Sequence, residues 1–208
     1  VMRELAAEDR AKAWRGDEVE RFPWSFDCGD AREQRDCALA RIMRSVREAL
    51  ETGPGIARMR GLVTHGEGAA RARILELGSQ LGTPLSQSTE GDLILDVRDR
   101  GYAPEDPRFR GPHSRRALRF HSDRCDVIGF YCVRAAAAGG ETEVLSSRAL
   151  YRALYERDPE ACATLCATFP YLRHTIDGAN PRPFTEMPVF AFREDRFHAS
   201  LLRVLIDR

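Results

Sequence analysis

The sequence predicts an α+β fold, because helical periodicity and short strand patterns both occur along one chain of 208 residues. Residues 30–50 and 67–81 repeat apolar side chains every three to four positions, which is typical of amphipathic helices. Further helices are expected at 147–157 and 159–168. Short apolar runs bounded by turn residues indicate strands at 56–60, 93–97, 127–133, 187–192 and from 197 onward.

The first 29 residues predict an irregular N-terminal arm, because they are polar and carry isolated aromatic side chains. We expect the arm to dock these aromatics on the rest of the molecule: Trp14, Phe22, Trp24 and Phe26. Residues 30–208 are expected to form a single domain. Its first helix has Asp30 as a suitable N-cap, and the sequence Gly53-Pro54-Gly55 ends it. The second helix is expected to turn Ala70, Ile74, Leu77 and Leu81 inward.

Two segments have the composition of long connections. Residues 98–119 are polar and contain three prolines, and residues 170–188 are also expected to be loop-rich. Ser146 and Ser147 precede the third helix and suit its N-terminus. Glu194-Asp195 is expected to form the turn between the last two strands.

Composition excludes several classes of function. The 32 basic and 32 acidic residues balance, so the chain has no overall attraction to nucleic acid or to an anionic membrane. No apolar run approaches the length of about 20 residues that a transmembrane helix needs. The first residues are charged and lack the pattern of a signal peptide, which predicts a cytoplasmic protein. The six cysteines form no C-x-x-C pair and are expected to be reduced.

The sequence His121-Ser122-Asp123 follows Leu118 and Phe120 and precedes the apolar run at 127–133. Side chains two apart on a strand point to the same face, so one imidazole and one carboxylate would project together. These are two of the three ligands in the 2-His-1-carboxylate triad of non-haem Fe(II) oxygenases. By itself the motif also fits a surface histidine beside a turn-forming aspartate.

The context of this motif resembles the taurine dioxygenase-like (TauD/TfdA) family of Fe(II)/2-oxoglutarate-dependent dioxygenases. Nineteen residues after Asp123 comes Thr142, in Gly139-Gly140-Glu141-Thr142, followed by the Ser-capped helix. Similar blocks occur at 81–88, at 91–97 and at 187–190. The resemblance extends from about Gly61 to the last residue.

The resemblance implies a double-stranded β-helix, or jelly roll, of the clavaminate synthase-like type with flanking N-terminal helices. It implies Fe(II) as cofactor with 2-oxoglutarate and O2 as cosubstrates, and oxidation, usually hydroxylation, of a C–H bond in a small molecule with release of succinate and CO2. His121 and Asp123 would bind the metal and Thr142 the C5 carboxylate of 2-oxoglutarate. Halogenating relatives replace the carboxylate ligand with Gly or Ala, so Asp123 favours oxidation over halogenation.

The sequence departs from the family at its end. The second metal histidine and the arginine that holds 2-oxoglutarate are not found after Asp123, so we expect the domain to be incomplete at its C-terminus. One alternative is a non-catalytic relative that acts as a binding or interaction module. A zinc or manganese jelly-roll enzyme would not explain Thr142. A nucleic-acid-binding module would have only the arginine content in its favour.

The substrate-facing residues implied by the resemblance lie in the segment that borders the pocket in relatives. The candidates are Gln87, Ser88 and Asp92, although each also fits an ordinary polar group at the end of a strand. The expected partner is a small-molecule substrate, with no nucleic acid and no membrane. A homo-oligomer is compatible with the sequence.

Overall fold

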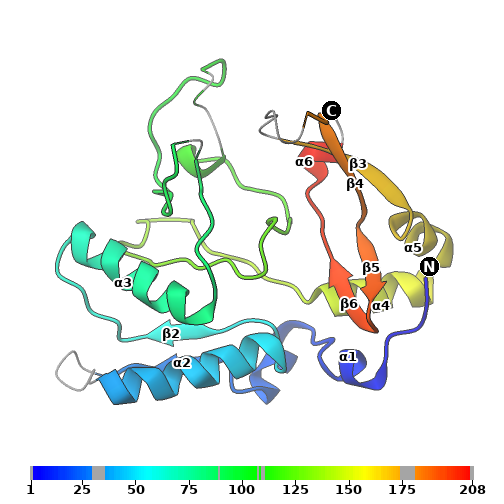
Figure 1. The fold of residues 1–208 in the computed structure, drawn as a ribbon, viewed down its shortest axis with the longest axis horizontal. Coiled ribbons are helices and arrows are strands. Elements are labelled where there is room, and N and C mark those ends of the chain that lie inside the picture. The colour runs from blue at the N-terminus through cyan, green and yellow to red at the C-terminus, as the bar shows by residue number, and fades with distance from the viewer. Residues whose placement is uncertain are drawn as a thin grey trace.

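Hydrophobic side chains gather in two clusters, one at each end of the molecule (Figure 1). The computed structural model describes residues 2–29, 36–88, 90–106, 108, 111–173 and 181–206. The segment between the clusters, residues 82–146, contains little regular structure apart from the 3-10 turn η2 (Gly111–His113). The polypeptide therefore folds around two separate groups of apolar contacts.

The first cluster lies between helices α2 (Asp36–Glu51) and α3 (Glu67–Leu81). It buries one face of each helix, through Leu39, Met43, Val46 and Leu77. Strands β1 (Ser25–Asp27) and β2 (Arg58–Arg60) run parallel beside the helices, with Ser25 opposite Arg58. Both helices and the strand at 56–60 were expected from the sequence and are confirmed. The proposed N-cap Asp30 lies outside the described residues.

The second cluster forms where helix α4 (Ser147–Arg157) and helix α5 (Pro159–Leu165) meet the C-terminal strands. Its buried members are Leu5, Tyr151, Cys162, Val189, Phe190 and Phe197. Asp158 caps α5, because its carboxylate accepts a hydrogen bond from the Ala161 amide at 2.9 Å, and Pro159 occupies the first helical turn. Cys162 is buried as a free thiol, as expected.

Four C-terminal strands pair as two antiparallel hairpins. Strand β3 (Thr168–Leu172) pairs with β4 (Phe184–Pro188), and strand β5 (Phe190–Arg193) pairs with β6 (Arg196–Ala199). The turn after β5 places Glu194 and Asp195 at φ 47° and 62°, as a two-residue turn with left-handed central residues requires. The expected turn at Glu194-Asp195 is confirmed.

The expectation of a loop-rich connection over residues 170–188 is wrong at both ends of that range, where β3 and β4 lie. The helix expected to reach residue 168 ends at Leu165. Phe169 turns toward the second cluster, so burial of an aromatic side chain decides the conformation there. Helix α6 (Arg203–Ile206) follows the last strand and contacts β3.

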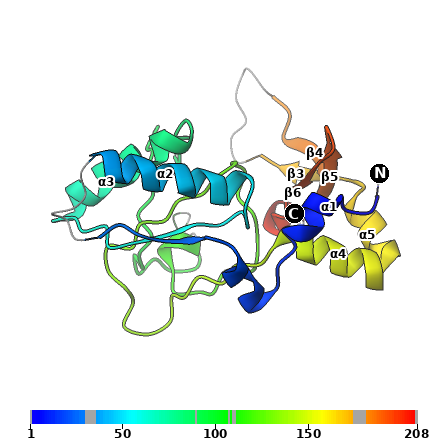
Figure 2. The same cartoon turned by 90° about the horizontal axis from the view of Figure 1, so that it is seen from below.

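The N-terminal arm connects the two clusters (Figure 2). It contains helix α1 (Ala7–Ala11) and the 3-10 helix η1 (Gly16–Arg21). Leu5 belongs to the second cluster, and the indole Nε1 of Trp14 donates a hydrogen bond of 2.9 Å to the carbonyl of Pro54, beside the first. Trp14 is buried and the other arm aromatics are half-buried. The predicted docking is confirmed for Trp14, Trp24 and Phe26. The expectation of an irregular arm is wrong, because α1, η1 and β1 form within it.

The predicted strands at 93–97 and 127–133 are not formed. Strand geometry needs a partner, because the backbone amides and carbonyls must be paired. Within the described parts of the chain, no backbone–backbone hydrogen bond involves residues 123–145. The apolar side chains of this run are exposed instead, up to 69% for Phe130. Tyr131 anchors the run, because its hydroxyl donates a 2.8 Å hydrogen bond to the Leu62 carbonyl.

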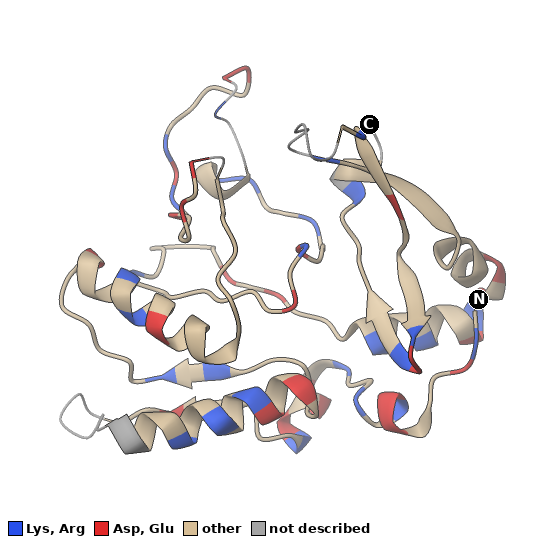
Figure 3. Cartoon of the chain, viewed as in Figure 1, with Lys and Arg blue, Asp and Glu red and all other residues tan. Residues whose placement is uncertain are grey.

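Charged side chains of both signs are mixed over the helices and loops (Figure 3). The described strands form three two-stranded sheets, so the architecture is mixed helix and sheet. None of the helices formed by the described residues has the length and apolar character to cross a membrane.

Replacing Leu5 with alanine is expected to lower the free energy of unfolding by roughly 2–4 kcal/mol, because it leaves a cavity in the second cluster. Urea denaturation measures the change. Leu150→Ala is the matched control, since Leu150 lies on the exposed side of α4 and its loss is expected to cost less than about 1 kcal/mol. Equal effects of the two substitutions would show that the arm does not share the core of α4.

Because the side chain of Tyr151 is buried, we expect the protein to lose stability in alkali. Burial, followed by smaller contributions that partly oppose one another, raises the pKa of Tyr151 to about 12. The folded state therefore holds this proton more tightly than the unfolded chain. Its contribution is complete below pH about 10, the ordinary tyrosine value, and disappears as the pH rises toward 12. Urea midpoints of Tyr151→Phe should depend less on pH across this window than those of the wild type; identical slopes would contradict the assignment.

Candidate functional site

His121 and Asp123 lie in an exposed, irregular segment between the two clusters. The Nδ1 atom of His121 is 2.7 Å from the carbonyl oxygen of Arg119. A carbonyl oxygen only accepts hydrogen bonds, so Nδ1 carries the proton. In the neutral ring this leaves the lone pair of Nε2 free, which is the state that binds a metal.

Ser122 ties this segment to the C-terminal part of the chain. The Ser122 amide donates to the carbonyl of Leu201 at 2.7 Å, and the Leu201 amide donates to the Ser122 hydroxyl at 2.8 Å. Sequence reasoning treated Ser122 only as the spacer of the motif. The partner is 79 positions away, and no local pattern identifies it.

The surroundings of the motif keep the nearby thiol neutral. Desolvation, and next the negative charges of Asp123 and Asp126, raise the pKa of the Cys125 thiol. A protonated thiol is a poor metal ligand and a poor nucleophile. The Cys125 thiol is therefore protonated at neutral pH in the metal-free protein.

Thr142 is exposed and lies just before helix α4. Gly139 and Gly140 precede it with φ values of 70° and 81°, a left-handed conformation that glycine adopts without strain. Downstream, the hydroxyl of Ser146 accepts a hydrogen bond from the amide of Ala149 at 3.3 Å and so caps α4, as expected. Thr142 therefore lies between a glycine turn and a capped helix.

The three substrate candidates form one loop. The Ser88 hydroxyl donates to the Asp92 carboxylate at 2.8 Å, and the Gln87 amide donates to the Asp92 carbonyl at 2.6 Å. The side-chain amide of Gln87 donates to the Leu85 carbonyl at 3.0 Å. These bonds hold Gln87, Ser88 and Asp92 together around the turn at Gly91, whose φ is 92°.

His121 and Asp123 share one segment because they are two residues apart in the sequence, whereas hydrogen bonds hold the three substrate candidates in one loop. Among the described residues, no hydrogen bond joins Thr142 or the Gln87 loop to His121 or Asp123. No group of three or more possible metal ligands occurs in the described ranges. The donor set at 121–123 is one imidazole nitrogen and one carboxylate, which suits a divalent metal such as Fe(II). It can supply two positions of a coordination sphere.

The chain is similar to known proteins of one family. The family model described as "Taurine catabolism dioxygenase TauD, TfdA family" matches residues 32–204. FR-33289 synthase of Streptomyces rubellomurinus is 34% identical over 116 residues, which is 54% of this chain and 34% of that protein. A taurine hydroxylase-like protein of Stachybotrys chartarum, SAT17, is 44% identical over 48 residues, which is 23% of this chain and 12% of that protein.

The matched segments cover well under two thirds of the length of either relative. The family match, in contrast, includes the H-x-D motif, the glycine turn with Thr142, and helices α3 and α4. On this evidence the chain belongs to the TauD/TfdA family of dioxygenases.

Proposed function

We propose that this chain is part of an Fe(II)/2-oxoglutarate-dependent dioxygenase that oxidises an unactivated C–H bond of a small molecule. The observation that carries the proposal is the state of His121. Its Nδ1–H is held by the Arg119 carbonyl, which leaves Nε2 free two residues before the carboxylate of Asp123. The family match supports the same chemistry.

In this proposal His121 and Asp123 hold Fe(II). Bound Fe(II) with 2-oxoglutarate supplies the chemistry of O2 activation, with succinate and CO2 as products. The hydrogen bond from His121 to Arg119 fixes the orientation of the ring, and the paired hydrogen bonds between Ser122 and Leu201 fix the backbone between the two ligands. Asp123 favours hydroxylation or a related oxidation, since the carboxylate occupies the position that halogenating relatives leave open.

Thr142 is proposed to donate a hydrogen bond to the C5 carboxylate of 2-oxoglutarate. Its hydroxyl makes no hydrogen bond with another described residue, so it is available for a ligand. Gln87, Ser88 and Asp92 are proposed to border the substrate. Their mutual hydrogen bonds hold the loop in one conformation, so a substrate would meet a preformed surface.

The proposed fold of the complete domain is the double-stranded β-helix. The exposed area supports this. The chain exposes 15176 Å² for a mass of 23.4 kDa, whereas a folded monomer of that mass exposes about 9,700 Å². Many of the exposed large apolar side chains lie between Leu85 and Leu145. In the proposal, further polypeptide pairs with these segments and brings the third iron ligand and the 2-oxoglutarate arginine.

The iron site is tested in the complete protein, which includes the polypeptide that brings the third ligand. It is titrated anaerobically with Fe(II) and 2-oxoglutarate, and the weak visible charge-transfer band of the chelate is followed. We expect the band in the wild type and its loss in His121→Ala and in Asp123→Ala, because each removes a ligand. His65→Ala and Asp126→Ala are matched controls at exposed positions outside the motif and should retain it. A band that persists in His121→Ala would contradict the ligand assignment. No band in the wild type would favour the non-catalytic binding module.

The role of Thr142 is tested by the affinity for 2-oxoglutarate. Thr142→Val keeps the shape of the side chain and removes the hydroxyl. A hydrogen bond to a charged group contributes about 1.5–3 kcal/mol, so the affinity should fall roughly tenfold to a hundredfold. Calorimetry on the Fe(II)-loaded protein under argon measures it. Thr142→Ser should remain close to the wild type, and equal weakening by Ser and Val would rule out the hydroxyl as the cause.

A further inference from the structure

The N-terminal arm lies along helix α4 in the opposite direction, with a hydrogen bond near each end of the contact. At one end, the amide of Arg3 donates to the hydroxyl of Tyr151 at 3.1 Å, and that hydroxyl donates to the Arg3 carbonyl at 2.5 Å. At the other, the hydroxyl of Ser146 donates to the carbonyl of Lys12 at 3.2 Å. Successive arm residues therefore meet successively earlier positions of the helix.

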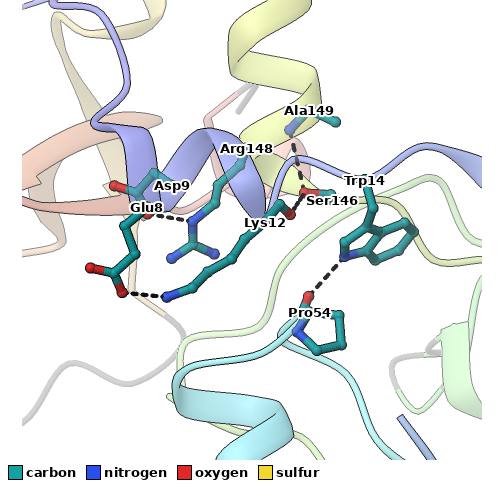
Figure 4. A network of polar contacts seen from close by, with 8 residues as sticks. All are labelled: Glu8, Asp9, Lys12, Trp14, Pro54, Ser146, Arg148 and Ala149. Carbon is teal, nitrogen blue, oxygen red and sulfur yellow. Dashed lines mark hydrogen bonds and ion pairs between the residues drawn. The ribbon is translucent and has the colours of Figure 1, made fainter. Parts of the chain in front are cut away.

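An ion pair lies between these two contacts. The guanidinium Nε of Arg148 is 2.6 Å from the carboxylate of Asp9 (Figure 4). The side chains are 28% and 12% exposed, so the pair is largely removed from water. Beside it, the Lys12 ammonium lies 2.6 Å from the carboxylate of Glu8. The Lys12 side chain is buried, whereas that of Glu8 is exposed. Removing one partner of such a pair leaves a buried charge without compensation, which is costly.

The contacts concentrate on the first turn of α4. Ser146 caps the helix through the Ala149 amide and also donates to the arm, and Arg148 lies in the same turn. Ser146 is buried under the arm (Figure 4). The start of α4 is therefore held by the arm as well as by its own cap.

The arm is itself fixed at its other end. The Trp14 indole is hydrogen-bonded to Pro54, and β1 pairs with β2. Residues 2–29 precede the region that matches the family, which begins at residue 32. The arm thus brings contacts from outside the family-matched region to a helix inside it.

Three residues separate the capped start of α4 from Thr142. Val144 and Leu145, which lie between, are exposed, and among the described residues the backbone of 139–145 makes no backbone–backbone hydrogen bond. The fixed point nearest to Thr142 in the sequence is therefore the first turn of α4. The segment that carries the threonine therefore starts from that turn.

We propose that residues 3–12 of the arm are a positioning element for the cosubstrate, with Asp9 and Arg148 as positioning residues. By holding the first turn of α4, the arm fixes residues 139–146 and sets the place of the Thr142 hydroxyl. This inference rests on the proposed role of Thr142 in binding 2-oxoglutarate. It predicts that an ion pair remote from the metal ligands in sequence controls cosubstrate affinity.

The first readout needs no metal. Hydrogen exchange followed by mass spectrometry should show several-fold faster exchange at residues 149–152, the first hydrogen-bonded amides of α4, in Asp9→Ala than in the wild type. Peptides from α2 and α3 should exchange as before, which shows that the first cluster remains folded. Glu4→Gln is the matched control, because it breaks the exposed Glu4–Arg10 ion pair of the same arm and should change neither region. Unchanged exchange at residues 149–152 in Asp9→Ala would overturn the positioning role.

The second readout separates affinity from turnover in the complete, Fe(II)-loaded enzyme. Asp9→Ala should raise the KM for 2-oxoglutarate about tenfold and leave kcat within about twofold, because saturation restores the bound state. Asp9→Glu should recover most of the affinity, since it keeps the charge. Arg148→Lys should weaken binding less than Asp9→Ala, and it provides the test if Asp9→Ala fails to fold.

The outcomes separate this inference from the proposed function. If Thr142→Val weakens binding and Asp9→Ala does not, the positioning role is overturned and the role of Thr142 stands. If the wild type binds no 2-oxoglutarate, the proposed function fails and the positioning role fails with it. The exchange measurement still decides whether the arm holds the first turn of α4.

Discussion

Burial of Tyr151 joins three parts of the chain that are far apart in sequence. Its ring is completely buried, with centroids 5.2 Å from Phe190, 5.1 Å from Phe197 and 5.5 Å from Phe192. Its hydroxyl would be costly to bury alone, and the backbone of Arg3 satisfies it as both donor and acceptor. The apolar ring therefore fixes the hairpin β5–β6 on α4, and the polar tip fixes the arm. A phenylalanine would serve only the first purpose.

The two clusters contrast with the segment that carries the candidate site. In each cluster the apolar faces of neighbouring elements pack against one another: α2 against α3, and α4 against the C-terminal hairpins. The segment 123–145 has apolar side chains of the same kind and makes none of these contacts. The motif at 121–123 is held at Ser122, by Leu201, and the run after it at Tyr131, by Leu62. Two isolated contacts between residues distant in sequence thus replace the continuous pairing of a sheet.

Local physics explains which elements could be predicted. Helices α2 and α4 follow from apolar periodicity, and α4 and α5 begin at the capping side chains of Ser146 and Asp158. The turn at Glu194 and Asp195 could be predicted because it depends only on residues adjacent in the sequence. Strands β3 and β4 were missed because Pro170 and the polar residues between them suggest a loop, whereas pairing of Thr168 with Pro188 depends on residues twenty positions apart. The strands expected at 93–97 and 127–133 fail for the same reason, since a pattern supplies no partner.

The candidate site, like the fold, has features that local sequence patterns predict and features that depend on contacts between distant residues. The H-x-D motif and the glycine turn before Thr142 could be recognised from residue types at a fixed spacing. The hydrogen bond from His121 to the Arg119 carbonyl depends on a backbone conformation, and the bonds between Ser122 and Leu201 depend on the fold. The arm's contact with α4 spans more than 130 positions, so no local pattern reveals it.

Lys12 is the only lysine among 32 basic residues, which gives the arm a distinct susceptibility to proteolysis. A protease that cuts only after lysine has one target in residues 1–208, the bond between Lys12 and Ala13. That bond lies between the contacts with α4 and the Trp14 anchor, and both flanking side chains are buried. Cleavage requires the arm to leave the helix, so its rate in the native protein, when opening is rapid, follows the equilibrium population of the detached arm. One cut at this bond would separate residues 1–12 from the Trp14 anchor without changing any side chain.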